Sequence, residues 1–114
     1  MKTAVVGASG YAGSELLRVI AAHPELDVVL ATGESAAGRR ISEHVPALAA
    51  HYPSHVFGAT SDVLASDAEV VFLALPHGAS QQLVPDLLAA GKQVVDLGAD
   101  YRLRSAEEYE QWYG

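Results

Sequence analysis

The stretch Val5–Gly13 (VVGASGYAG) decides the fold of this chain, because an apolar run leads into it and an amphipathic run follows it. Gly7, Gly10 and Gly13 stand at a G-x-x-G-x-x-G spacing within the stretch. Glycines so placed let the backbone turn with positive φ, approach a ligand closely and pack a helix tightly against a sheet. The helix that follows directs free N–H groups and a partial positive charge at the turn, and both attract a phosphate.

A dinucleotide is the ligand that this context favours, since a strand precedes the glycines and a helix follows them. The alternative is a domain of the same build that binds a different phosphate ligand, or none. The residues of this loop expected to contact the cofactor are Gly7, Ser9, Gly10, Tyr11, Ala12 and Gly13.

Apolar runs bounded by glycine or proline alternate with amphipathic runs along the chain. The expected strands are Thr3–Val6, Asp27–Thr32, Glu69–Leu75 and Gln93–Leu97. The expected helices are Tyr11–His23, a short helix within Ile41–Ala50, a helix or turn over Thr60–Ser66, Ala79–Ala90, and a last helix that begins at Ser105. Continuous apolar strands joined by helices predict an α/β fold, a Rossmann-like doubly wound parallel sheet with helices on both faces. A chain of 114 residues is one such domain, or part of a larger one.

The composition argues against several classes of function. The net charge of −7 disfavours nucleic acid as a partner, because phosphate backbones reward clustered Lys and Arg. No apolar run reaches the roughly 20 residues of a membrane span, and the N-terminal residues lack a signal-peptide pattern. We therefore expect a cytoplasmic protein without a membrane partner. The chain contains no cysteine, so it holds no disulfide, thiolate metal site or cysteine nucleophile of its own.

The residues after the second expected strand carry opposite signals about the cofactor. Glu34 lies about 20 residues beyond the last glycine, where an acidic side chain accepts a hydrogen bond from the ribose 2′-OH and favours NAD. Ser35, Arg39 and Arg40 follow it and are suited to hold a 2′-phosphate, which favours NADP. Each of these charges would otherwise be an ordinary solvated loop charge.

Two later turns lie at the carboxyl ends of strands, where ligands bind in open α/β sheets. Pro76, His77 and Gly78 end the third expected strand, and we expect them beside the cofactor. His77 would line the nicotinamide pocket there, with acid or base chemistry as the alternative. Arg102 follows the fourth strand and is suited to clamp a phosphate or carboxylate; the alternative is a salt bridge with a neighbouring aspartate.

Three histidines, His44, His51 and His55, invite a metal interpretation. Pro53 lies between the last two and spoils the helix that their four-residue spacing would need. Because the chain also lacks an H-E-x-x-H pattern, we expect no metal site.

Four stretches together, Gly7–Gly13, Ala74–Gly78, Val95–Leu103 and Tyr109–Gly114, resemble N-acetyl-gamma-glutamyl-phosphate reductase along the whole chain. The resemblance implies an NADPH-dependent enzyme of arginine biosynthesis, a homo-oligomer at full length. It would convert N-acetyl-L-glutamyl 5-phosphate to N-acetyl-L-glutamate 5-semialdehyde and phosphate. Arg102 would then bind the substrate phosphate. Where the family usually carries a Ser-Arg pair after the second strand, this chain has Gly33 and Glu34.

In that family the catalytic cysteine and histidine lie in a second, α+β domain. Because this chain has no cysteine, residues 1–114 are expected to be the isolated NAD(P)-binding domain, with no catalytic residue of its own and no activity alone. The expected cofactor is NADP rather than NAD. The alternatives are the cofactor domain of a related aspartate-semialdehyde or short-chain-type dehydrogenase, or a nucleotide-sensing module without enzymatic activity.

Overall fold

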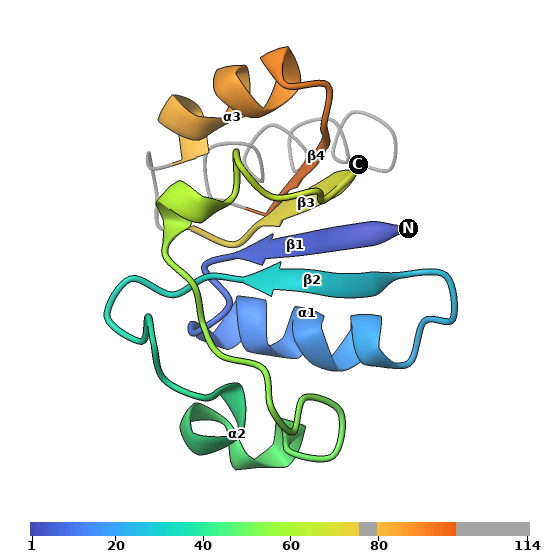
Figure 1. Ribbon diagram of the computed structural model, residues 1–114, viewed down its shortest axis with the longest axis vertical. Coiled ribbons are helices and arrows are strands. Elements are labelled where there is room, and N and C mark those ends of the chain that lie inside the picture. Colours follow the sequence, from blue (N-terminus) through green and yellow to red (C-terminus); the bar gives the residue numbers. More distant parts are fainter. Residues whose placement is uncertain (76–79, 98–114) are drawn as a thin grey trace, which may run out of the picture.

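The computed structural model describes residues 1–75 and 80–97, and those residues form alternating strands and helices (Figure 1). The strands are β1 (Lys2–Val6), β2 (Asp27–Ala31), β3 (Val70–Leu73) and β4 (Gln93–Asp96). The α-helices are α1 (Tyr11–Ala21), α2 (Ile41–His44) and α3 (Ser80–Ala89), and the 3-10 helices are η1 (Pro46–Leu48) and η2 (Thr60–Asp62). Within these residues each expected strand and helix is present. The helix expected from Ser105 lies outside the described residues.

The four strands form one parallel sheet in the order β2-β1-β3-β4. The chain passes from β1 outward to β2, then returns to the other side of β1 to form β3 and β4. The order therefore reverses between β1 and β3, which makes the carboxyl ends of these two strands the topological switch point of the sheet. The predicted Rossmann-like topology is confirmed for the described strands.

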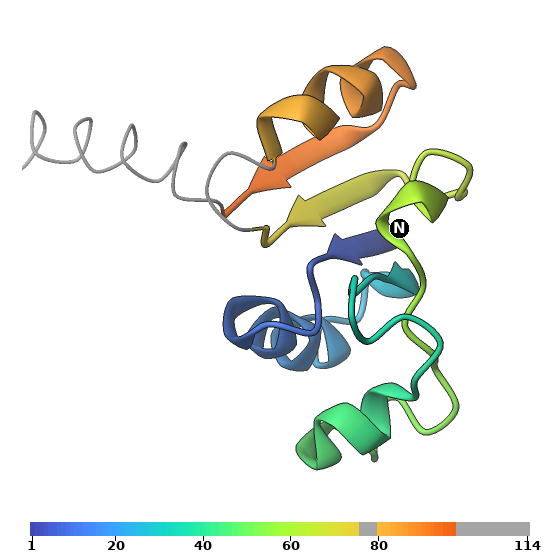
Figure 2. The ribbon, with the colours of Figure 1, turned by 90° about the vertical axis from the view of Figure 1, so that its left-hand side faces the viewer.

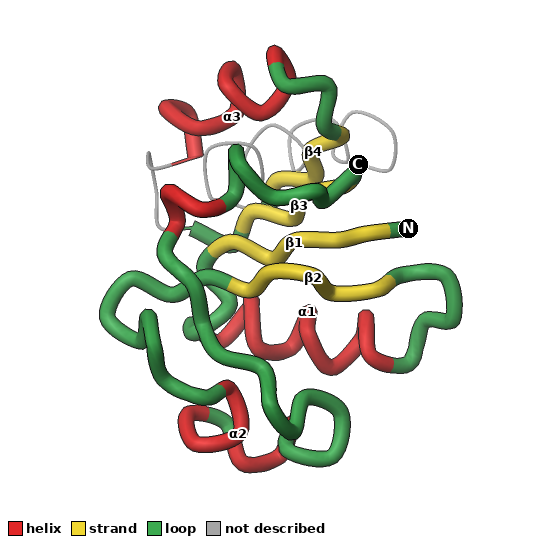
Figure 3. The backbone as a smooth tube through the Cα atoms, viewed as in Figure 1, coloured by secondary structure: helices red, strands yellow, loops and turns green. Residues whose placement is uncertain are grey.

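Alternate residues of β1 enter two separate cores, one on each face of the sheet. Val5 packs with α1 residues Leu17 and Ile20 and with the segment between β2 and β3. Ala4 and Val6 pack on the other face in the core that contains Leu87 of α3. Helices therefore cover both faces, as predicted, and Figures 2 and 3 show them flanking the strands.

The short helix expected within Ile41–Ala50 is present as α2, and a separate 3-10 helix, η1, follows it. α2 ends at His44 and η1 begins at Pro46, with Val45 between them at φ −130° and ψ 88°. A proline ring clashes with a helical conformation of the preceding residue, which forces Val45 out of the helical region. The break turns the chain, so that Ile41 and Leu48, from the two pieces, enter the same core.

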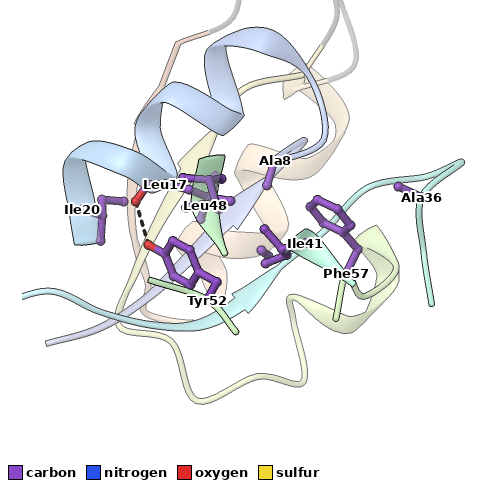
Figure 4. Packing of buried hydrophobic residues seen from close by; sticks show 10 residues of the cluster. Ala8, Leu17, Ile20, Ala36, Ile41, Leu48, Tyr52 and Phe57 are labelled. Carbon is purple, nitrogen blue, oxygen red and sulfur yellow. Dashed lines mark hydrogen bonds between the residues drawn. The ribbon is translucent and has the colours of Figure 1, made fainter. Parts of the chain in front are cut away.

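The segment between β2 and β3 packs on α1 through an apolar cluster and one buried hydrogen bond (Figure 4). The Tyr52 hydroxyl donates to the Leu17 carbonyl oxygen over 2.7 Å. Burial raises the pKa of Tyr52 above its ordinary value of 10.0, because the charged phenolate loses its hydration there.

β2 carries an irregularity in its pairing with β1. The partner of Thr3 is Val28, but the partner of Ala4 is Leu30, so Val29 is an extra residue in the ladder. Val29 is 39% exposed. A bulge of this kind bends the strand that holds the extra residue and increases its twist.

Candidate nucleotide-binding site

The switch point brings the end of β3 against the start of the glycine-rich loop, residues 7–13. Val6 is the register partner of Leu73, and the Ala74 N–H donates to the Val6 carbonyl oxygen over 2.8 Å. Gly7 follows directly, with φ +81°. A Cβ at Gly7 would lie 2.4 Å from the Ala74 carbonyl oxygen, so both its conformation and its surroundings require glycine.

Gly13 is required for a different reason, the close packing of α1 on the loop. A Cβ there would lie 2.3 Å from the Gly7 carbonyl oxygen and 2.6 Å from the Ala8 Cα atom. Both contacts are with backbone, which does not move aside as a flexible side chain does. Gly13 is thus the glycine of close helix packing that the spacing predicts.

Gly10 differs from the other two because the packing of the protein leaves room for a side chain there. A Cβ at Gly10 would meet only the Gly7 carbonyl oxygen, at an ordinary 3.7 Å. Gly10 is the N-cap of α1, with extended backbone (φ −80°, ψ 174°) and no capping side chain. The first-turn N–H groups, those of Tyr11, Ala12 and Gly13, therefore have no capping side chain to which they could donate a hydrogen bond. Among the described residues no side chain caps this helix end, and the absent Cβ of Gly10 leaves room there for an anion.

Hydrogen bonds to Thr32 and Ser14 fix the peptide groups at the start of the loop. The buried Thr32, just after β2, accepts the Gly7 N–H at its Oγ1 atom over 3.2 Å and the Ala8 N–H at its carbonyl oxygen over 2.7 Å. The Ser14 hydroxyl donates to the Ala8 carbonyl oxygen over 3.0 Å. Neither Thr32 nor Ser14 was among the predicted site residues. Thr32 has a sequence signal, a polar residue placed directly after an apolar strand.

The chain after β2 lies beside the glycine-rich loop. Gly33 is buried there, and a Cβ on it would lie 2.7 Å from the Ser9 Oγ atom. The position where the resembled family carries serine therefore has no room for that side chain unless Ser9 moves. The next residue, Glu34, is exposed, as is Ser35.

Arg39 and Arg40 are exposed, and they lie on a short stretch of chain that pairs antiparallel with Val56 and Phe57 to form a ribbon. The Phe57 N–H donates to the Arg39 carbonyl oxygen over 2.9 Å, and Arg40 forms a bridge with Val56. Gly38 starts the ribbon with φ +87°. The backbone of both arginines is thus anchored while their side chains face solvent.

The other predicted site residues lie outside the described part of the chain. These are Pro76, His77 and Gly78 after β3, and Arg102 after β4. The described residue nearest to the first group, Leu75, has its Cδ2 atom 3.3 Å from where a Cβ on Gly7 would lie.

The three histidines considered as metal ligands do not come together in one place. The His44 ring lies against the glycine-rich loop. His51 and His55 both line a different cavity, together with Asp27, and the His55 ring makes an edge contact with Tyr52. Among residues 1–75 and 80–97, no group of three or more histidine, aspartate or glutamate side chains is arranged to hold a metal ion. The same described residues include no helix with both the length and the apolar character needed to cross a membrane.

One charged pair that shifts pKa values lies at the opposite end of the sheet from the loop. Lys2, at the start of β1, donates to Asp67 over 2.6 Å. This hydrogen bond holds the pKa of Asp67 below its usual value and raises that of Lys2. Both side chains are largely exposed, so the pair makes little difference to stability.

A parallel sheet with a glycine-rich turn and an open helix end at its switch point defines a nucleotide-binding domain of the Rossmann type. A family model described as "Semialdehyde dehydrogenase, NAD binding domain" matches residues 2–112. The chain therefore belongs to the semialdehyde dehydrogenase NAD-binding domain family.

Curated relatives match along the whole chain. N-acetyl-gamma-glutamyl-phosphate reductase of Ectopseudomonas mendocina is 46% identical over 114 residues, which is 100% of this chain and 33% of the relative. The reductase of Geobacter sulfurreducens is 46% identical over 113 residues, 99% of this chain and 33% of that protein. The chain thus spans about a third of the length of these relatives.

A solved structure, aspartate semialdehyde dehydrogenase with NADP from Candida albicans, has a similar fold. Its TM-score is 0.74 at 23% identity, covering 89% of this chain and 30% of that chain. At this identity the likeness concerns the fold alone.

Proposed function

We propose that this chain is the NADP-binding domain of an N-acetyl-gamma-glutamyl-phosphate reductase. The complete enzyme would reduce N-acetyl-L-glutamyl 5-phosphate to N-acetyl-L-glutamate 5-semialdehyde and phosphate, a step of arginine biosynthesis in the cytoplasm. The observation that carries the proposal is the identity to curated reductases over the whole chain. The open end of α1 at the switch point supports the part of it that concerns the cofactor.

The loop residues have distinct roles in this proposal. The cofactor pyrophosphate approaches the backbone at Gly10, where a Cβ would stand in its way, and accepts hydrogen bonds from the first-turn N–H groups of α1. Ser9, Tyr11 and Ala12 contact the cofactor beside it. Gly7 and Gly13 give the loop its shape.

The choice between NADP and NAD depends in this proposal on the exposed segment after β2. Ser35, Arg39 and Arg40 bind the 2′-phosphate, because guanidinium and hydroxyl groups donate to its oxygens. Glu34 repels that phosphate and favours the ribose hydroxyl of NAD. The domain therefore prefers NADP through two arginines and one serine, against the charge of one glutamate.

The chemistry of the reaction requires residues from both this chain and the rest of the enzyme. NADPH supplies the hydride. Pro76, His77 and Gly78 line the nicotinamide side, and Arg102 binds the substrate phosphate through its guanidinium. The thiol that attacks the acyl phosphate comes from outside this chain, which contains no cysteine. The complete enzyme is proposed to be a homo-oligomer.

The experiment is a paired assay of the full-length protein. NADPH and NADH are titrated by protein fluorescence, and the reverse reaction is followed as NADPH formed from N-acetyl-L-glutamate 5-semialdehyde, phosphate and NADP. We expect NADPH to bind more tightly than NADH and turnover to require phosphate. Aspartate semialdehyde is the matched competing substrate. Equal or faster turnover of aspartate semialdehyde would contradict the proposed substrate, and failure to bind either nucleotide would contradict the whole proposal.

A further inference from the structure

His44 contacts the glycine-rich loop although it comes from α2, which is 35 residues away in the sequence. Its Nε2 atom lies 3.0 Å from the Ser9 carbonyl oxygen. A carbonyl oxygen accepts only, so the ring nitrogen must carry the proton and donate it in this bond. His44 is therefore in the Nε2–H form, either as the neutral tautomer or as the imidazolium.

His44 is exposed, and one side of its imidazole contacts the core. It makes an edge contact with the Phe57 ring, with the ring centroids 5.5 Å apart and the planes at 90°. Phe57 is 2% exposed and shares its core with Ile41 and Ala8 (Figure 4). The Ile41 N–H donates to the His55 carbonyl oxygen over 3.0 Å, which ties the start of α2 to the same ribbon. The helix α2, which carries the Nε2–H donor, is therefore tied at its start to the core and to the ribbon.

The bond from His44 completes the support of one peptide group in the loop. The carbonyl of the Ser9–Gly10 peptide receives the imidazole N–H, and the N–H of the same peptide donates to the Gly7 carbonyl oxygen over 3.3 Å. Both ends of this planar unit are therefore held, directly before the residue that begins α1. A loop already held in its binding geometry loses less entropy when a ligand arrives.

We propose that His44 is a positioning residue for the cofactor: its Nε2–H holds the Ser9–Gly10 peptide in the orientation that receives the pyrophosphate. This proposal rests on the proposed function, since it names a further residue of the same site. His44 acts through the Ser9 carbonyl and does not itself touch the nucleotide.

The test compares two substitutions in the full-length protein. His44→Phe keeps an aromatic ring against Phe57 and removes the donor, whereas His44→Gln keeps an N–H donor at a similar reach. We expect His44→Phe to raise the dissociation constant for NADPH about fivefold, and His44→Gln to keep it close to that of the parent. In the cofactor-free protein, the backbone amides of residues 9–11 should exchange with deuterium faster in His44→Phe than in the parent.

His51→Phe is the matched control, because it makes the same change at an exposed histidine that lines a separate cavity. It should leave NADPH affinity and amide exchange unchanged. Unaltered affinity in His44→Phe would overturn the proposal, as would equal weakening by His44→Phe and His44→Gln together with a lowered melting temperature. If the parent protein binds no NADPH, the proposed function fails, and with it the role of His44. Altered exchange in residues 9–11 would then still report the bond to the loop.

Discussion

The glycine-rich loop after β1 and the segment after β2, residues 33–40, lie side by side but are built in opposite ways. The first is held by backbone contacts: Gly7 and Gly13 leave no space for a Cβ, and Thr32 binds two of its amides. The second exposes its charged side chains on an anchored backbone. The first therefore recognises what all dinucleotides share, a pyrophosphate, and the second distinguishes one dinucleotide from another.

Gly13→Ala gives the strongest test of whether the glycine-rich loop depends on close backbone packing. The added Cβ would lie 2.3 Å from the Gly7 carbonyl oxygen, so α1 must shift away from the loop. We expect a loss of about 3 kcal/mol in the free energy of unfolding, measured by urea denaturation followed by circular dichroism. An unchanged unfolding midpoint would show that α1 is free to move and that the loop is less rigid than described.

Gly10→Ala is the matched substitution at the position where the protein itself has room. Its Cβ meets one backbone atom at 3.7 Å, so the free energy of unfolding should change by less than about 1 kcal/mol. In contrast, the dissociation constant for NADPH should rise about tenfold or more, because the Cβ occupies the approach of the pyrophosphate. Fluorescence titration measures this, and a drop in stability without a drop in affinity would reverse the roles assigned to the two glycines.

Tyr52→Phe tests the packing on α1 of the chain that follows residues 33–40. Removing the bond to the Leu17 carbonyl oxygen should cost about 1 kcal/mol in the free energy of unfolding at neutral pH. The raised pKa of Tyr52 means that the unfolded chain loses this proton first, so the parent loses stability as the pH rises above 10.0. Parent and Tyr52→Phe should therefore converge in alkaline urea titrations. A gap that widens above pH 10.0 would contradict the direction of the shift.

Glu34→Gln has the smallest expected effect. It tests whether the segment of residues 33–40 distinguishes NADP from NAD. Removing the exposed charge should tighten NADPH binding about threefold and weaken NADH binding, with the effect reduced at high salt. Glu43→Gln, the same change at an exposed glutamate of α2, is the control and should alter neither affinity. A parallel shift for both nucleotides would mean that Glu34 does not read the 2′ position.

The sequence predicted the parts of the site that are built from backbone better than the contacts made by side chains. The spacing of Gly7, Gly10 and Gly13 and the apolar strands around them are local signals, and they suffice to indicate the turn, the helix and the parallel topology. His44 was considered only as a metal ligand, because its bond to Ser9 joins residues far apart in sequence. The 3-10 helix η1 after Val45 was not predicted, because a single turn of three residues leaves no periodic pattern in the sequence.

The extra residue in β2 has a consequence for how the molecule meets its own copies. β2 is the outer strand at one side of the described sheet, and an outer strand that is flat and regular can recruit a strand from a second molecule. The shifted register at Val29 interrupts the regular pairing of β2, and the exposed Asp27 puts a charge at its start. This rim of the sheet is therefore a poor template for intermolecular pairing, which protects a half-hydrophobic chain against aggregation.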